Sequence, residues 1–80
     1  MTRLDRGFVV NFGNADRQQV LAWLVSTMLD PPYQLTANNT SARDDQGRYR
    51  WRMALKNTDQ RVLFDHEADA ALFEMVWAAN

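Results

Sequence analysis

The sequence predicts a single α+β domain, residues 1–80, in which two helices pack on one face of a small antiparallel sheet. Two observations support this fold class. Alternating apolar residues, typical of strands, mark several short segments, whereas apolar residues at helical spacing mark 15–29 and 66–78. The resulting order is β-α-β-β-β-α, and consecutive strand segments joined by short turns favour antiparallel pairing. A chain of 80 residues is also too short for a second domain.

The first strand and the first helix are predicted for residues 7–12 and 15–29. Gly13 ends the strand, and Asn14 is a suitable N-terminal cap because its side chain accepts backbone hydrogen bonds. Three apolar residues share one face of the strand: Phe8, Val10 and Phe12. The helix carries an apolar stripe of Val20, Leu21, Leu24, Val25 and Met28. Two prolines follow Asp30 and end the helix, since proline cannot continue it.

The central segment is predicted to contain two strands. Residues 33–43 begin with alternating apolar residues and then become polar on both faces, so we expect a strand that leaves the core partway along. The turn 44–47 contains a glycine that can adopt positive φ. It leads into 48–56, R-Y-R-W-R-M-A-L-K, in which alternate residues predict two faces. The inner face is Tyr49, Trp51, Met53 and Leu55; the outer face is Arg48, Arg50, Arg52 and Lys56.

A short strand over 61–64 and a helix over 66–78 complete the predicted fold. Asp65 is predicted to cap this helix, and Glu67 and Asp69 suit its positive N-terminal end. The predicted packing stripe of the helix is Ala68, Leu72, Met75, Val76 and Ala79. For the core of the whole domain we expect Phe8, Leu24, Trp51 and Met53.

Composition narrows the function classes. Nine Lys and Arg residues against ten Asp and Glu residues give a net charge of −1, which argues against strong non-specific binding to a polyanion. The chain has no cysteine, so it forms no disulfide, and this suits a reducing compartment. Its apolar runs are too short for a transmembrane helix, and the first residues, M-T-R-L-D-R-G, do not resemble a signal peptide. We expect a cytoplasmic protein.

The basic outer face of segment 48–56 has three interpretations. The favoured one is a solvated strand face whose charges discourage edge-to-edge pairing. The alternative is a small RNA- or DNA-binding domain that contacts phosphates through Arg48, Arg50, Arg52 and Lys56. Against this alternative, Tyr49 and Trp51 are predicted to point inward, whereas such domains place aromatic residues on the basic face. In a third interpretation Arg50 and Arg52 recognise an acidic protein surface.

No catalytic or metal-binding motif is present. His66 lies between two acidic residues, but the sequence offers no nucleophile motif beside it, so an exposed or helix-capping histidine is favoured over a general base. One histidine with scattered carboxylates does not make a metal ligand set. Asp44 and Asp45 are adjacent in a turn and face different ways. We therefore predict a protein that is not an enzyme and has no metal or cofactor.

Aromatic residues on the two helices suggest a protein interface. Trp23 lies beside the apolar stripe of the first helix, and Phe73 and Trp77 share the flank of the last helix. Surplus aromatic residues either wrap the rim of the core or anchor a partner. In the second case Trp23, Phe73 and Trp77, together with Arg50 and Arg52, are the predicted partner-binding residues, and the partner is another protein or a second copy in a homodimer.

The segment V-L-F-D-H-E-A-D-A-A-L-F-E-M-V-W, residues 62–77, resembles the ends of many small bacteriophage-encoded proteins. Its features are a short strand, an acidic turn and a helix with aromatic residues. Such proteins are often single α+β domains without cysteine that bind and inhibit a host enzyme or defence complex. The resemblance implies a non-catalytic inhibitor that acts by occlusion in the host cytoplasm.

Overall fold

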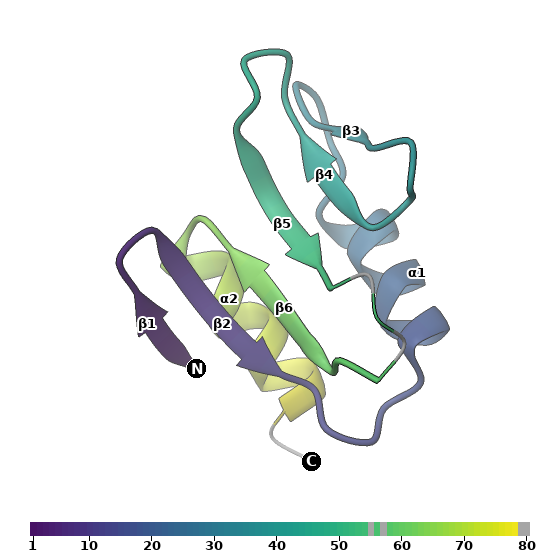
Figure 1. Cartoon of the computed structure of the whole chain (residues 1–80), viewed down its shortest axis with the longest axis vertical. Helices are drawn as coiled ribbons and strands as arrows, with labels where there is room; N and C mark the ends of the chain where they lie inside the picture. Colours follow the sequence, from purple (N-terminus) through teal and green to yellow (C-terminus); the bar gives the residue numbers. More distant parts are fainter. Residues whose placement is uncertain (55, 57, 79–80) are drawn as a thin grey trace.

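The chain forms an α+β domain in which an antiparallel sheet is backed by helices. The computed structural model describes residues 1–54, 56 and 58–78. Within them the strand order across the sheet is β1-β2-β6-β5-β4-β3. In Figure 1 the helices lie on the far side of the sheet and the near side is open. The predicted fold class is confirmed.

The elements differ from the prediction in number more than in order. The strands are β1 (Thr2–Leu4), β2 (Gly7–Asn11), β3 (Gln34–Leu35), β4 (Ser41–Arg43), β5 (Tyr49–Met53) and β6 (Arg61–Phe64). The helices are α1 (Arg17–Thr27) and α2 (Glu67–Phe73), and α2 continues as a π-helical turn, η1 (Glu74–Ala78). Among the described helices none has the length and apolar character needed to cross a lipid bilayer.

Strand β1 was not predicted, because its three residues are all exposed and carry no apolar alternation. It pairs with β2 through a tight hairpin in which Leu4 faces Gly7. Gly7 has φ +154°, and a Cβ atom there would lie 2.6 Å from the Phe64 carbonyl oxygen in β6. A glycine is therefore required where the hairpin enters the sheet.

The segment predicted as one strand, 33–43, is instead the short hairpin β3–β4. Its turn is built by polar residues: the Thr36 amide donates to the Ser41 carbonyl (2.9 Å), and the two hydroxyls are also 2.9 Å apart. Asn39 takes positive φ (59°), a conformation that asparagine adopts more readily than most residues. The polar run between the two strands thus reverses the chain at the edge of the sheet.

Helix α1 packs as predicted but begins later. Asp16, rather than Asn14, is the N-cap, and its carboxylate accepts a hydrogen bond from the Gln18 amide at 2.8 Å. The predicted stripe faces the core: Val20, Leu24 and Met28 are buried, and Leu21 and Val25 are partly buried. The guanidinium of Arg17 also donates to the Asp59 carbonyl oxygen at 2.8 Å, which fixes the start of α1 against the loop before β6.

The last helix presents the opposite face from the one predicted. Ala70 and Phe73 are buried, whereas four residues of the predicted packing stripe are exposed: Ala68, Leu72, Met75 and Val76. The fifth, Ala79, lies outside the described residues. The Phe73 ring fills the space between the sheet and α1, with its centroid 5.2 Å from Phe64 and 5.8 Å from Trp23. The N-cap is His66 rather than Asp65.

The core is a single apolar layer between sheet and helices. Trp51, Met53 and Leu24 are buried, as predicted, but Phe8 is only partly buried. The indole nitrogen of Trp51 donates to the Met28 carbonyl oxygen at 2.9 Å, so this side chain joins β5 to the end of α1. The prediction that Leu55 faces inward lies outside the described residues.

Candidate functional site

A β-bulge in β5 rearranges the basic strand. Ala42 of β4 pairs with Trp51, but the next residue, Arg43, pairs with Tyr49, so Arg50 is an extra residue in β5. An extra residue changes which side chains lie on each face of a strand. The regular alternation predicted for residues 48–56 therefore fails at Tyr49 and Arg50.

Arg50 turns to the helix side and ties three elements together. Its Nε lies 3.1 Å from Oδ2 of Asp69 in α2, and its Nη1 pairs with Asp30, just after α1. The guanidinium also lies over the Tyr33 ring, 5.9 Å from its centroid. Burial lowers the pKa of Arg50, but its hydrogen bonds and charge attraction to Asp69 and Asp30 outweigh that effect and raise the pKa. Arg50 thus joins β5 to α2 and to the segment after α1, and its contact with a partner or phosphates stays a prediction.

Tyr49 turns the other way, onto the open face of the sheet. Two guanidiniums lie close to its ring: the Cζ of Arg52 is 4.7 Å from the ring centroid, and the Cζ of Arg43 is 5.9 Å away. The prediction that Tyr49 points inward is wrong. We refer to Arg43, Tyr49 and Arg52 as the arginine–tyrosine cluster.

The remaining cations of the predicted basic row do not extend this cluster along β5. Arg48 is exposed in the β4–β5 turn, where the Asp44 carboxylate accepts its amide hydrogen bond at 2.8 Å. Lys56 is exposed and follows the end of β5. Arg61 of β6 is held by Asp59 at 2.7 Å, and the hydrogen bond from Arg61 is the main reason that the pKa of Asp59 is lowered.

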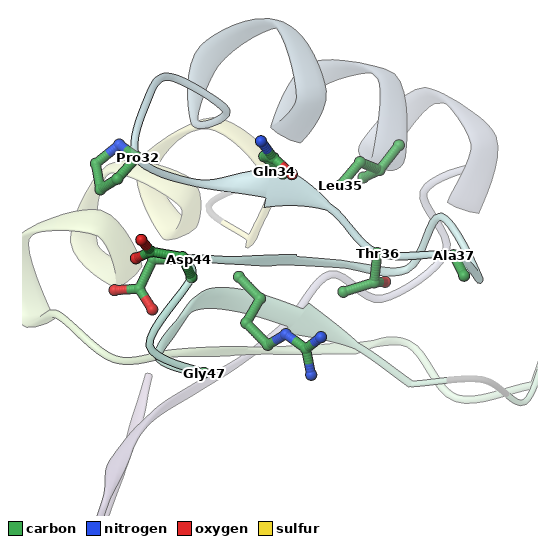
Figure 2. A pocket seen from close by; sticks show the side chains of 9 residues that line it. Pro32, Gln34, Leu35, Thr36, Ala37, Asp44 and Gly47 are labelled. Atoms are coloured by element: carbon green, nitrogen blue, oxygen red, sulfur yellow. The ribbon is translucent and has the colours of Figure 1, made fainter.

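Two hollows flank the arginine–tyrosine cluster. The polar hollow, about 520 Å³, is lined by Pro32, Gln34, Leu35, Thr36, Ala37, Arg43, Asp44, Asp45 and Gly47. Figure 2 shows it between the β3 segment and the turn that carries Asp44 and Gly47. The apolar hollow, about 300 Å³, is lined by Leu4, Val9, Arg52, Met53, Ala54, Asp59, Arg61 and Leu63. Arg43 borders the first hollow and Arg52 the second.

The predicted aromatic patch is the seam between the helices. Trp23 of α1 meets Phe73 and Trp77 edge-on, at centroid distances of 5.8 and 6.4 Å. Phe73 is fully buried and both tryptophans are partly buried against the core. Phe73 is therefore not accessible to a partner in this structure, and the two tryptophans, whose role in partner binding stays a prediction, pack α1 against the last helix.

The residues left exposed by this packing form a different surface. Leu72, Met75 and Val76 are 39, 69 and 37% exposed, and Ala68 is exposed one turn before Leu72. We call Ala68, Leu72, Met75 and Val76 the outer helix face. Sequence reasoning missed it because both sides of the last helix are apolar, so periodicity alone did not decide which side packs.

The residues considered for chemistry are dispersed. His66 is exposed at the start of α2 and makes no side-chain capping bond. Asp44 accepts hydrogen bonds from the Gln46 and Arg48 amides and so stabilises the turn. In the described part of the chain, no three His, Cys, Asp or Glu side chains are grouped so that they could hold a metal ion. Comparison with family models, with curated proteins and with solved structures finds no match for this chain.

Proposed function

We propose that the chain is a non-catalytic protein-binding module that docks onto a partner protein through the outer helix face. The observation that carries this proposal is the exposure of Leu72, Met75 and Val76 together on one side of the last helix. Contiguous exposed apolar side chains are typical of protein interaction sites. Methionine suits such a surface because its flexible side chain adapts to the shape of a partner.

The packing of the last helix against the core supports the same proposal. Phe73 anchors α2 in the core, and Trp77 anchors η1 against Trp23. The outer helix face is thus held rigidly, and a rigid surface loses little conformational freedom on binding. Binding by such a surface requires no catalytic group, which fits an inhibitor that acts by occluding part of its target.

The class of partner follows from the resemblance of residues 62–77 to bacteriophage-encoded inhibitors. On that basis we propose a bacterial enzyme or defence complex as the partner, met in the cytoplasm. A second copy of the chain is the other protein that the same surface could bind, because an apolar helix face can close on itself by twofold symmetry.

The experiment compares Met75→Glu with Ala22→Glu, which places the same charge at an exposed position of α1. Each purified protein is measured by light scattering and is used to capture partners from a bacterial lysate. We expect Met75→Glu to lose a captured partner, or to lose a dimer, that both the wild type and Ala22→Glu retain. If Met75→Glu keeps its fold and behaves as the wild type in both measurements, the outer helix face is not the binding surface.

A further inference from the structure

We infer that the open face of the sheet is a second binding surface, specific for single-stranded nucleic acid, with the arginine–tyrosine cluster at its centre. This face lies on the side of the sheet opposite the helices (Figure 1). The inference is independent of the proposed protein-binding function, because no residue of the outer helix face takes part in it.

Tyr49 lies on the same face of the sheet as two arginines. Proteins that bind single strands combine aromatic rings, on which bases stack, with cations that contact the backbone on the same face. The bulge at Arg50 creates this combination, because it moves Tyr49 onto the face that carries Arg43 and Arg52. Tyr49 is half-buried, so part of its side chain remains accessible to a ligand.

Arg43 and Arg52 differ from Arg50 in their partners. Arg50 pairs with Asp30 and Asp69 on the helix side of the sheet. Arg43 and Arg52 are exposed, and among the described residues neither forms an ion pair with a carboxylate. A chain with a net charge of −1 thus carries, beside the Tyr49 ring, two guanidiniums that have no ion pair in the described structure. Such a local field attracts phosphates even when the net charge does not.

The surface on either side of the arginine–tyrosine cluster is hollowed. A single strand that crosses Arg43 and Arg52 meets the polar hollow on one side and the apolar hollow on the other. Leu4, Val9 and Leu63 offer apolar surface to the plane of a base. In the polar hollow the exposed amide of Gln34 and the carboxylate of Asp45 can bond the polar edge of a base. The acidic residues in the polar hollow repel phosphates. The phosphate backbone of the nucleic acid therefore lies over Arg43 and Arg52.

A duplex fits this face less well than a single strand. Stacking on Tyr49 requires an unpaired base, and the bases of a duplex are already stacked on one another. Direct reading of duplex DNA usually uses a helix or a two-stranded ribbon inserted into the major groove. On this face the described residues present the surface of a sheet, with the helices behind it (Figure 1).

The test is fluorescence anisotropy with a labelled oligothymidylate and a labelled RNA, each about 12 nucleotides long. We expect wild-type affinity to fall about sevenfold between ~50 and ~200 mM salt, as two neutralised phosphates require. In Arg52→Gln one phosphate contact is lost, so the fall should shrink to about threefold. Tyr49→Leu should weaken binding about tenfold at both salt concentrations, whereas Tyr49→Phe, which keeps the ring, should bind as the wild type does.

Arg6→Gln is the matched control, because Arg6 is exposed in the β1–β2 turn and its loss changes net charge equally. Arg6→Gln and Met75→Glu should bind the oligonucleotides like the wild type. Three results would overturn the inference: no wild-type binding at low salt, equal weakening by Arg6→Gln and Arg52→Gln, or unchanged binding by a folded Tyr49→Leu. The inference would also be overturned if polyglutamate bound as tightly as the oligonucleotides, because the ligand would then be an acidic protein.

Discussion

Trp51 combines burial with a hydrogen bond that few other side chains could replace. It is fully buried, and its indole N–H donates to the Met28 carbonyl oxygen at the end of α1. Carbonyl groups in the last turn of a helix have no partner within the helix, so a side-chain donor there stabilises the helix end. The same residue thus fills the core and closes α1.

Replacement of Trp51 should separate these two contributions. Trp51→Phe removes the donor and leaves the Met28 carbonyl without its partner, which we expect to lower the free energy of unfolding by about 1–3 kcal/mol. Trp51→Ala also opens a cavity and should cost about 3–5 kcal/mol. Urea unfolding measures both. Tyr49→Phe, on the open face, is the control, and a Trp51→Phe variant as stable as this control would contradict the assignment.

Arg50 and Arg52 are two residues apart in β5 but have different surroundings. Arg50→Gln removes the pairing with Asp30 and Asp69 on the helix side, so we expect a loss of about 1–3 kcal/mol of stability. Arg52→Gln, which changes an exposed side chain without an ion pair in the described structure, should stay within about 0.5 kcal/mol of the wild type. Thermal melts of the two variants under the same conditions give the comparison, and equal losses would argue against the bulge.

At the scale of elements, the orientation of the last helix decides which surface remains for a partner. Phe73 occupies the space between the sheet and α1, and Trp77 continues the contact along η1. An aromatic ring buries more apolar area than a leucine side chain, so the helix rotates its rings inward. Leu72 and Met75 are exposed as a consequence.

Trp77→Ala tests this orientation. Truncation of a tryptophan that is free to contact a partner would cost little stability. The edge-on contact of Trp77 with Trp23 and its tilted contact with Phe73 instead imply a loss of about 2–4 kcal/mol. We expect the variant to unfold at lower urea concentration while still associating where it remains folded. Met75→Glu is the comparison, with a stability change within about 0.5 kcal/mol because Met75 is 69% exposed. If Met75→Glu lost more stability than Trp77→Ala, the aromatic residues rather than the outer helix face would be the interface.

At the scale of the molecule, a single core joins both halves of the sheet to both helices. Phe64 of β6 contacts Phe73 of α2, and Trp51 of β5 bonds to the end of α1. The radius of gyration, 11.6 Å, matches the value of about 12 Å expected for one compact domain of this length. No pair of elements in the described chain forms a separate core from which independent unfolding could start.

The shared core predicts a single cooperative unfolding transition. Trp23 and Trp77 report on the helix seam and Trp51 on the sheet, so tryptophan fluorescence samples both parts. Fluorescence and far-ultraviolet circular dichroism should give the same urea midpoint, with a slope of about 1 kcal/mol per molar for so small a domain. Separate midpoints would mean that the β3–β4–β5 half unfolds independently of β1–β2–β6.

The fold class, the order of the main elements and most of the core could be predicted from the amino-acid sequence alone. The stripe of α1 and the positions of Val10, Trp51 and Met53 follow from spacing, because alternation and helical periodicity record which side of an element avoids water. The turn at Asp44–Gly47 was also predictable, since aspartate and glycine suit its backbone for local reasons. Strand β1 was not, because its exposed residues carry no such record. The hairpin β3–β4 was not, because the two buried residues of β4, Ser41 and Ala42, are small and one of them is polar, so they give no apolar alternation.

The candidate binding surfaces, in contrast, depend on contacts between distant segments of the chain. Tyr49 and Arg50 exchange faces because Asp30 and Asp69, distant in sequence, lie where Arg50 can pair with both. The last helix turns its aromatic residues inward because Phe64 and Trp23 provide the space for Phe73. In β5 and in the last helix, the spacing of apolar residues was compatible with two orientations of the side chains. Contacts between segments far apart in the chain selected one of them, and periodicity within a segment holds no information about such contacts.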